Sequence, residues 1–286
     1  MGTTGVSILP TKSDGKQMTM LNKTEQFPGQ WGVQFNSTNI GGQIVVTASR
    51  ADLTAAMLAD KIAFRTNADE WQARMVFDVN GQGLSLRHSN AHYRDLMDKA
   101  DIIHADGGFM VTLSRWMGEH QIVERSATTD LIHDFAACSD HEDLRFYLLG
   151  GTDEVNGKCA HELSRLYPRL KIVGRRHGYY DDVDEAEIVQ EINDARPDVV
   201  WVGLGKPKEQ EFCVRNRERI RASWLVTCGG CFNYITGDYA RAPLWMQRLN
   251  LEWVFRMASN PKRFLVRYLT TSPHALYLAL AKSKWR

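Results

Sequence analysis

The feature of this sequence that most constrains its fold is an alternation of short apolar runs with longer amphipathic stretches. The apolar runs, expected to be strands, lie at residues 75–79, 102–105, 145–149, 171–174, 199–204 and 224–227. Helical patterns fill most of the intervals, for example at residues 153–166, 184–195 and 209–221. This alternation is typical of βαβ units, so the sequence predicts an α/β, Rossmann-like fold with a mainly parallel sheet flanked by helices.

The chain divides into three parts by composition. In residues 1–43, 24 of 43 positions are Gly, Ser, Thr, Asn or Gln, and no apolar periodicity is sustained, which predicts a flexible leader. Order is expected to begin with a β-branched run at residues 44–47, followed by a helix at 51–64. We therefore expect an α/β catalytic domain over residues 44–240 and a basic helical appendage over 241–286.

Charge sets the C-terminal part apart. Residues 239–286 contain nine Lys or Arg and one acid, a net charge of +8, whereas the preceding 238 residues carry 26 Lys or Arg and 33 Asp or Glu, a net charge of −7. Such asymmetry indicates that the basic part meets an anionic partner. Pro243 suits a helix start, and a second helix is expected from Pro261, with Pro273 ending or kinking it.

Composition also excludes several classes of protein. No apolar run approaches the roughly 18 residues of a membrane-spanning helix. The start of the chain lacks the basic and apolar regions of a secretory signal, which favours a cytoplasmic location. An odd number of cysteines, five, argues against a disulfide framework.

In a parallel sheet, ligands bind at the carboxyl ends of the strands, so the residues that follow each predicted strand are the candidates for chemistry. Three such places are glycine turns: Gly150-Gly151, Gly203-Leu204-Gly205 and Gly229-Gly230. Their backbone amides can approach a diphosphate closely, although glycine at a tight turn also serves backbone geometry alone. None has the spacing of a dinucleotide fingerprint or a Walker loop.

Polar side chains follow two further strands. Asp106 comes directly after residues 102–105 and is either a general base or a helix N-cap. Asp78 and Asn80 can reach the same cleft. Arg125 is suited to bidentate phosphate contact, but a surface ion pair is the favoured interpretation of this residue taken alone.

Two other patterns have the spacing of metal ligands. Cys228 and Cys231 form a C-x-x-C pair, but no second pair is present to complete a zinc site. His88 and His92 stand four residues apart in a stretch that resembles a loop. Small buried side chains are the favoured interpretation of the first pattern, and we expect a metal at neither.

Taken together, these segments resemble the WecG/TagA/CpsF family of bacterial glycosyltransferases, glycosyltransferase family 26. The resemblance runs in order from about Arg74 to Tyr268. Its motifs are Ala105-Asp106-Gly107, Glu124-Arg125 with Asp130-Leu131, residues 146–151, Leu166-Tyr167-Pro168, Gly178-Tyr179, Ala195-Arg196-Pro197-Asp198, residues 202–207, Gly229-Gly230 with Phe232, Gly237 with Arg241-Ala242-Pro243, and Leu251-Glu252-Trp253 with Arg256.

The resemblance implies an inverting enzyme that moves a sugar from a UDP-sugar to a polyprenyl-diphosphate-linked saccharide, for an exopolysaccharide, capsule or wall polymer. It implies catalysis without a cofactor or metal, at the cytoplasmic face of the membrane, with the anionic membrane surface as a partner. Asp106 corresponds to the family's general base, with Asp78 left open as an alternative. A homo-oligomer, the donor sugar and the linkage are also left open.

The candidate binding residues form two sets. Those expected at the substrates are Asp78, Asn80, Arg125, Gly150, Gly151, Gly205, Pro207, Glu209, Gln210, Gly229, Gly230, Asn233 and Arg241. Those expected at the lipid are Arg256, Lys262, Arg263 and Arg267.

Four positions depart from the family pattern and bear on the donor sugar. Asp78-Val79-Asn80 stands where relatives commonly have Thr-x-Asn, and Thr128 stands where they have Gly. Glu209-Gln210 replaces Gln-Glu, and Phe232-Asn233 replaces Phe-Asp.

Two rival functions remain at this point. The basic tail contains eight aromatic residues and could bind nucleic acid, although the same pattern suits anionic lipid, and we expect no nucleic-acid partner. A soluble nucleotide-sugar-modifying enzyme is the second alternative, but it needs a cofactor fingerprint that the sequence lacks.

Overall fold

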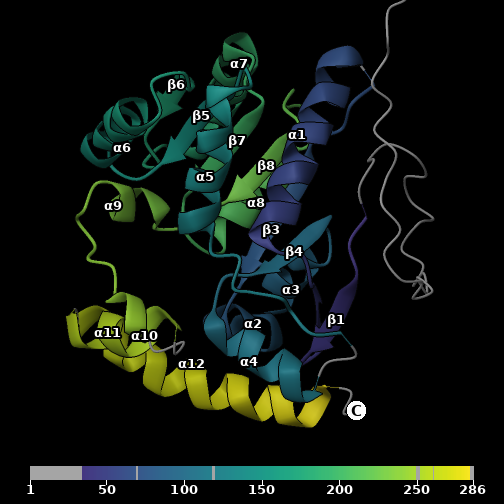
Figure 1. The fold of residues 1–286 in the computed structure, drawn as a ribbon, viewed down its shortest axis with the longest axis vertical. Coiled ribbons are helices and arrows are strands. Elements are labelled where there is room, and N and C mark those ends of the chain that lie inside the picture. The colour runs from purple at the N-terminus through teal and green to yellow at the C-terminus, as the bar shows by residue number, and fades with distance from the viewer. Residues whose placement is uncertain (1–33, 69, 118–119, 249–251, 260, 284–286) are drawn as a thin grey trace, which may run out of the picture. The chain divides into compact units, whose positions relative to one another are not determined.

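The core of the fold is a six-stranded sheet in which every neighbouring pair is parallel, in the order β4-β3-β8-β7-β5-β6 (Figure 1). The computed structural model describes residues 34–68, 70–117, 120–248, 252–259 and 261–283. The strands of this sheet are β3 (Arg74–Val79), β4 (Ile102–Ala105), β5 (Arg145–Gly150), β6 (Lys171–Arg176), β7 (Val199–Gly203) and β8 (Trp224–Thr227). The six strands of this sheet therefore lie where the sequence predicts them.

Helices connect the strands and complete the chain. They are α1 (Arg50–Thr66), α2 (Gly81–Ser89), α3 (Ala91–Met97), α4 (Gly108–Met117), α5 (Thr128–Ala137), α6 (Asp153–Leu166), α7 (Glu185–Ala195), α8 (Lys208–Asn216), α9 (Cys231–Ile235), α10 (Leu244–Arg248), α11 (Glu252–Ser259) and α12 (Pro261–Lys282), with short 3₁₀ turns at Cys138–Asp140 and Asp182–Asp184. Side-chain caps fix several starts: Ser49 and Asp52 form a capping box at α1, and Thr152 caps α6.

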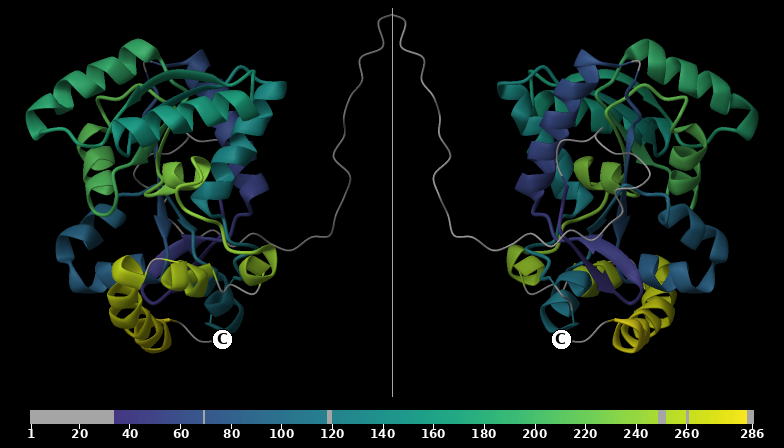
Figure 2. Two further views of the ribbon diagram at one scale, coloured as in Figure 1. Left: turned by 90° about the vertical axis from the view of Figure 1, so that its left-hand side faces the viewer. Right: turned by 90° about the vertical axis from the view of Figure 1, so that its right-hand side faces the viewer.

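Both faces of the sheet are covered, as a parallel sheet requires (Figure 2). Alternate side chains of the strands enter two separate cores. On one face, residues such as Val76 and Trp201 pack with α1, α5 and α6. On the other, residues such as Phe77 and Val202 pack with α2, α3, α7 and α8. The α/β prediction is confirmed, and the strands are buried on both faces.

Two boundaries differ from the sequence prediction. Order does not begin at Ile44, because Ser37–Ile40 forms strand β1, which pairs with β2 (Gln43–Val46) as an antiparallel hairpin. Thr38 and Ile40 are buried, so the polar composition of this stretch concealed a strand with one buried face. Residues 1–33 of the predicted leader lie outside the described residues. The helix predicted over 209–221 ends at Asn216, where the chain turns toward β8.

The strand order creates a crevice at the carboxyl ends of β3 and β8. The chain leaves β3 for its outer neighbour β4, whereas it reaches β8 from β7 on the opposite side. Connections that diverge in this way leave space above the two central strands, the usual ligand site of an open α/β sheet.

The C-terminal helices lie beside this crevice. Helix α12 packs along α2 and buries Ala275, Leu278 and Ala279 (Figure 1). The helix continues through Pro273, so of the two predicted effects, an end or a kink, the first is wrong. Burial of residues beyond the proline outweighs one missing backbone hydrogen bond. Within the described residues, no helix is both long and apolar enough to cross a membrane.

Candidate active site

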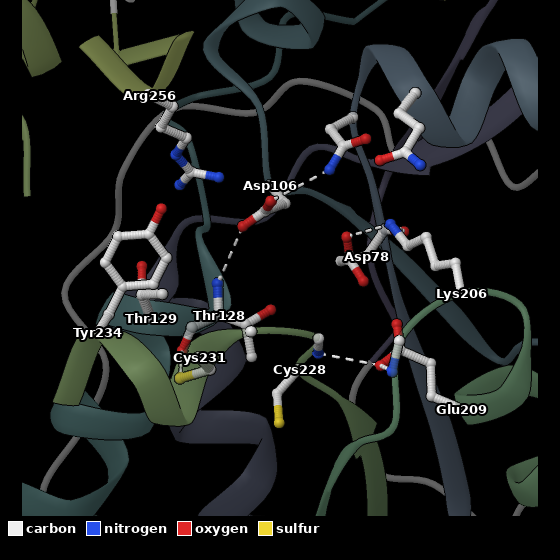
Figure 3. A pocket seen from close by; sticks show the side chains of 15 residues that line it. Asp78, Asp106, Thr128, Thr129, Lys206, Glu209, Cys228, Cys231, Tyr234 and Arg256 are labelled. Carbon is white, nitrogen blue, oxygen red and sulfur yellow. Dashed lines mark hydrogen bonds and ion pairs between the residues drawn. The ribbon is translucent and has the colours of Figure 1, made fainter. Parts of the chain in front are cut away.

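Residues that follow β3, β4, β7 and β8 surround a cavity of 320 Å³, which we call the polar cavity (Figure 3). Seven of the predicted catalytic and substrate residues line it: Asp78, Asn80, Asp106, Gly205, Glu209, Gly229 and Gly230. These seven residues, which are up to 152 positions apart in the chain, lie at or beyond the carboxyl ends of predicted strands, and the structure places them around one cavity. The lining also includes Gln82, Thr129, Lys206 and Tyr234, which the sequence prediction missed.

Asp106 projects into the centre of this site. It directly follows β4, and its backbone amide donates to the carbonyl of Val79 at the end of β3. Its Oδ1 accepts from the backbone amide of Thr128 at 3.3 Å, and its Oδ2 accepts from Nδ2 of Asn80 at 3.4 Å. Asn80 also caps α2 through Gly83, so the start of that helix fixes the amide that orients the carboxylate.

Asp78 is paired within the protein. Its carboxylate forms a short ion pair with Nζ of Lys206, which also donates to the backbone carbonyl of Asp78 at 3.2 Å. The second carboxylate oxygen accepts from the hydroxyl of Thr227 at 3.4 Å. Burial opposes the charge on Lys206, but the charge of Asp78 outweighs it and raises the pKa of the lysine above its usual range. The lysine between Gly205 and Pro207 was the available signal for this partner.

Glu209 is fully buried and holds two of the glycine turns together. Its Oε2 accepts from the amide of Gly205 at 3.1 Å and from that of Gly229 at 3.0 Å. Burial and the negative charge of Asp78 raise the pKa of Glu209 to about 7, against the opposing effects of Lys206 and the two amides.

The glycine turns therefore differ from the open anion cradles that the sequence suggested. The amides of Gly205 and Gly229 are bonded to Glu209, and that of Gly151 donates to the carbonyl of Gly203 at 3.2 Å. At Gly150 a side chain is excluded, because a Cβ would lie 2.2 Å from the Gly203 carbonyl oxygen. Positive φ angles at Gly205 and Gly229 and close strand packing at Gly150 thus account for these glycines.

The other residues predicted to bind the substrates do not line the polar cavity. Gln210 is buried beside Glu209, Pro207 precedes α8, and Asn233 lies on α9. Arg241 donates to Asp130 at 2.7 Å and also to Gln247. The side chains of Lys262, Arg263 and Arg267 lie outside the described residues.

A cluster of ion pairs joins the C-terminal helices to the site. Glu252 on α11 accepts from Arg125 in a short ion pair and from Arg256 at 2.7 Å. Arg125 also donates to Asp130 at 3.2 Å. Burial alone disfavours the charge on Glu252, but Arg256 and Arg125 overcome it and lower the pKa of Glu252 to about 2.

Arg256 lies beside Asp106 in the structure. We expect it at the lipid, but its guanidinium group lies over the Tyr234 ring, 5.0 Å from the centroid, and lines the polar cavity near Asp106 (Figure 3). The Arg125 pair is also no surface pair, since its side chain is 17% exposed. The cause is α11, which packs its charged face inward.

A second cavity, of 620 Å³, adjoins the first and is largely apolar; we call it the apolar cavity. Its walls come from the start of α4, from α11 and from α12, and include Phe109, Met257 and Leu276. Four residues line both cavities: Asn80, Gln82, Asp106 and Arg256. Asp106 therefore stands where a polar and an apolar space meet.

The residues of the two metal-ligand patterns have separate surroundings in the structure. Cys228 and Cys231 are free, buried thiols, and burial raises the pKa of each well above its usual range. His88 contacts Gly41 and Lys282, whereas His92 pairs with Glu211, so the two histidines do not share a ligand. Among the described residues, no group of three His, Cys, Asp or Glu side chains is placed to hold a metal.

The geometry describes an α/β enzyme with a carboxylate at a strand end, and comparison with known proteins identifies its family. The sequence model of the family described as "Glycosyl transferase WecG/TagA/CpsF family" matches residues 44–286. The chain belongs to this family, and it is a glycosyltransferase.

Several relatives carry one name, N-acetylglucosaminyldiphosphoundecaprenol N-acetyl-beta-D-mannosaminyltransferase. The protein of Bacillus subtilis (strain 168) is 32% identical over 208 residues, which is 73% of this chain and 80% of the relative. The protein of Staphylococcus aureus (strain MRSA252) is 29% identical over 212 residues, 73% of this chain and 82% of the relative.

Proposed function

We propose that this chain transfers a sugar from a UDP-sugar to a saccharide that is linked through a diphosphate to a polyprenyl lipid, with Asp106 as the general base. The observation that carries the proposal is the position of Asp106 at the junction of the polar and apolar cavities. One cavity offers charged and hydrogen-bonding groups to a nucleotide-sugar, and the other offers an apolar surface to a lipid-linked acceptor. The names of the relatives describe an acceptor of this kind.

The chemistry follows from the surroundings of Asp106. Its carboxylate takes the proton of an acceptor hydroxyl as that oxygen forms a bond to the anomeric carbon, and the bond from this carbon to the UDP oxygen breaks. The electron pair leaves with UDP, and attack from the opposite side inverts the anomeric centre. Asn80 and the amide of Thr128 orient the carboxylate. Asp78 is a poorer base, because its carboxylate is ion-paired with Lys206, whereas both partners of Asp106 are neutral.

The departing diphosphate needs a cation, and Arg256 supplies one beside Asp106. Its side chain is 24% exposed, and its Nε is buried without a partner among the described residues. Glu252 holds one edge of the guanidinium group and leaves donors for a ligand. A preorganised donor aimed at developing negative charge is a large contributor to catalysis.

The lipid end of the acceptor is expected to enter the apolar cavity from the membrane. Leu269 and Leu276 line this cavity and are also 64% and 45% exposed, so its rim continues onto an apolar surface. Tyr277 extends that surface along α12, and Trp253 lies on α11. We propose peripheral binding at the cytoplasmic face through this surface, with anionic headgroups as partners of the basic tail.

The test uses the full chain, a panel of UDP-sugars and a short-chain prenyl-diphosphate N-acetylglucosamine acceptor. In Asp106→Asn, transfer should fall ~10²- to 10⁴-fold, the range that a general base contributes. UDP should still raise the melting temperature, because ligand that binds only the native state stabilises it. Asp95→Asn is the matched control, since that side chain is 69% exposed on α3.

Two outcomes would overturn the proposal. The first is near-normal turnover of Asp106→Asn, and the second is a melting temperature that responds to no uridine nucleotide. Running the assay with and without EDTA tests the expectation of metal-independent transfer, for which equal rates are required.

A further inference from the structure

Three charged side chains form the deep end of the polar cavity, and we call them the sugar floor: Asp78, Lys206 and Glu209. Their side chains are strongly buried, with exposed fractions of 8% for Asp78, 10% for Lys206 and 0% for Glu209. Figure 3 shows Arg256 on one side of Asp106 and the sugar floor on the other. A donor whose diphosphate lies at Arg256 and whose anomeric carbon lies near Asp106 therefore extends its sugar ring toward the sugar floor.

The hydrogen bonds of the sugar floor determine what it can offer a ligand. Lys206 is committed to two oxygens of Asp78, one from the carboxylate and one from the backbone. One oxygen of Glu209 accepts from the amides of Gly205 and Gly229, and the other accepts from Nε2 of Gln210 at 3.4 Å. The lysine charge is masked, whereas each carboxylate keeps lone pairs that accept hydrogen bonds. The sugar floor is thus suited to hydroxyl donors and opposes a further negative charge.

We propose that Asp78, Lys206 and Glu209 are the donor-sugar subsite, which selects a UDP-sugar whose ring is uncharged and rejects one that carries a carboxylate. This inference rests on the proposed function and adds the class of its donor. It also gives a role to two of the departures from the family pattern, since Asp78 and Glu209 stand where relatives commonly have Thr and Gln. The lysine carries one positive charge against two carboxylates, so changing both carboxylates to amides leaves that positive charge uncompensated.

Binding of the donor alone tests the inference, because no acceptor is needed. Isothermal titration calorimetry measures the affinity of the full chain for UDP, UDP-glucose, UDP-N-acetylglucosamine and UDP-glucuronate. The two UDP-sugars with an uncharged ring should bind at least ~10-fold more tightly than UDP-glucuronate, since like-charge contacts are strongly unfavourable. UDP-glucuronate binding as tight as the others, or tighter, would overturn the inference while leaving the proposed function intact. Absence of binding by every ligand, UDP included, would overturn both.

Amide substitutions provide a second, independent readout. The double variant Asp78→Asn with Glu209→Gln keeps the shape of both side chains and the acceptor for Gly205 and Gly229, but it leaves Lys206 unmasked. UDP-glucuronate should then gain at least ~10-fold in affinity relative to UDP-glucose. The reason is that an uncompensated buried cation is unfavourable, and the carboxylate of the uronate would pair with it.

A triple variant that adds Lys206→Met is the matched control, and it should lose this gain. Because it contains no unpaired buried charge, it also shows whether the amide changes alone perturb folding, as measured by thermal denaturation. An unchanged preference in a folded double variant would contradict the assignment. If the double variant does not fold, the comparison of ligands on the unaltered chain decides the question.

Discussion

The polar and apolar cavities meet at Asp106 but are built in different ways. The polar cavity consists mainly of residues that follow the central strands, and two of its charged groups, Asp78 and Lys206, pair with each other. The apolar cavity is closed by α11 and α12, which come from the far end of the chain. The sheet therefore sets the chemistry, whereas the C-terminal helices set access to it. Arg256 is the point where the second part contributes to the first.

Arg256→Ala gives the largest expected effect on this division, because Arg256 belongs to the C-terminal helices by sequence and to the reaction by position. Turnover with a short-chain acceptor should fall ~10²- to 10³-fold, the cost of removing one preorganised donor at a developing charge. Arg256→Lys should recover part of this loss, since it keeps the charge but not the planar fork that pairs with Glu252.

A vesicle-binding assay on the same Arg256 variants separates the two interpretations of this residue. If Arg256→Ala releases the protein from anionic vesicles and leaves turnover unchanged, the residue serves the lipid, as the sequence pattern suggested. The C-terminal helices would then act on access alone and contribute no group to the reaction, contrary to the position of Arg256.

The charge pair at Glu252 gives the next effect, on stability. The pKa of Glu252 is lowered to about 2 from an ordinary 4.5, so its stabilisation is complete above pH 4.5 and is lost as the pH falls toward 2. Glu252→Gln should lower the free energy of unfolding by roughly 3 kcal/mol at pH 7, given an 8% exposed side chain. Denaturant titrations at pH 7, 4.5 and 3 should show the difference between the two proteins shrinking with acid.

The control for Glu252 is Glu162→Gln, which breaks the exposed pair with Arg165 on α6. That change should cost less than ~1 kcal/mol at any of these pH values, because solvent screens a surface pair. A constant difference for Glu252→Gln across the pH range would mean that packing, rather than charge, links α11 to the domain.

Filling the apolar cavity gives a smaller and more selective effect. Ser272 is exposed at the edge of the cavity on α12, so Ser272→Trp should add bulk where the lipid enters. We expect the KM for a long-chain acceptor to rise about tenfold, ~1.4 kcal/mol, with no change in UDP binding. Tyr277→Trp, on the same helix and 65% exposed, does not line the cavity and should have no such effect. Equal effects of the two would argue against a lipid site.

The two cavities also differ in how far the sequence predicts them. Strand periodicity is local, so the ends of β3, β4, β7 and β8 followed from short apolar runs, and Asp106 with its neighbours could be placed at one edge of the sheet. Local patterns cannot predict hydrogen bonds between residues that are distant in the sequence. Glu209 accepts the amides of two turns, and nothing local in either turn reveals that these amides are occupied.

The apolar cavity was not predictable for the same reason. The sequence predicted helices from Pro243 and from Pro261, but not which of their faces meet the domain. Packing placed the charged face of α11 inward, through Glu252, and left Trp253 44% exposed. The strand at residues 37–40 was missed for a similar reason. It pairs with β2 and its buried face joins the domain core, neither of which its polar sequence reveals.

The smallest expected effect concerns the far end of α12. Ser283 is buried, and its hydroxyl oxygen accepts from the amide of Gly41 in the β1–β2 turn at 2.8 Å. Ser283→Ala leaves that amide without an acceptor and should cost about 1 kcal/mol of stability. If α12 controls access alone, hydrogen exchange should rise in α12 and the acceptor KM should increase slightly, while UDP affinity stays constant. A loss of UDP affinity would instead show that the C-terminal helix and the polar cavity are energetically coupled, and the division drawn between them would have to be abandoned.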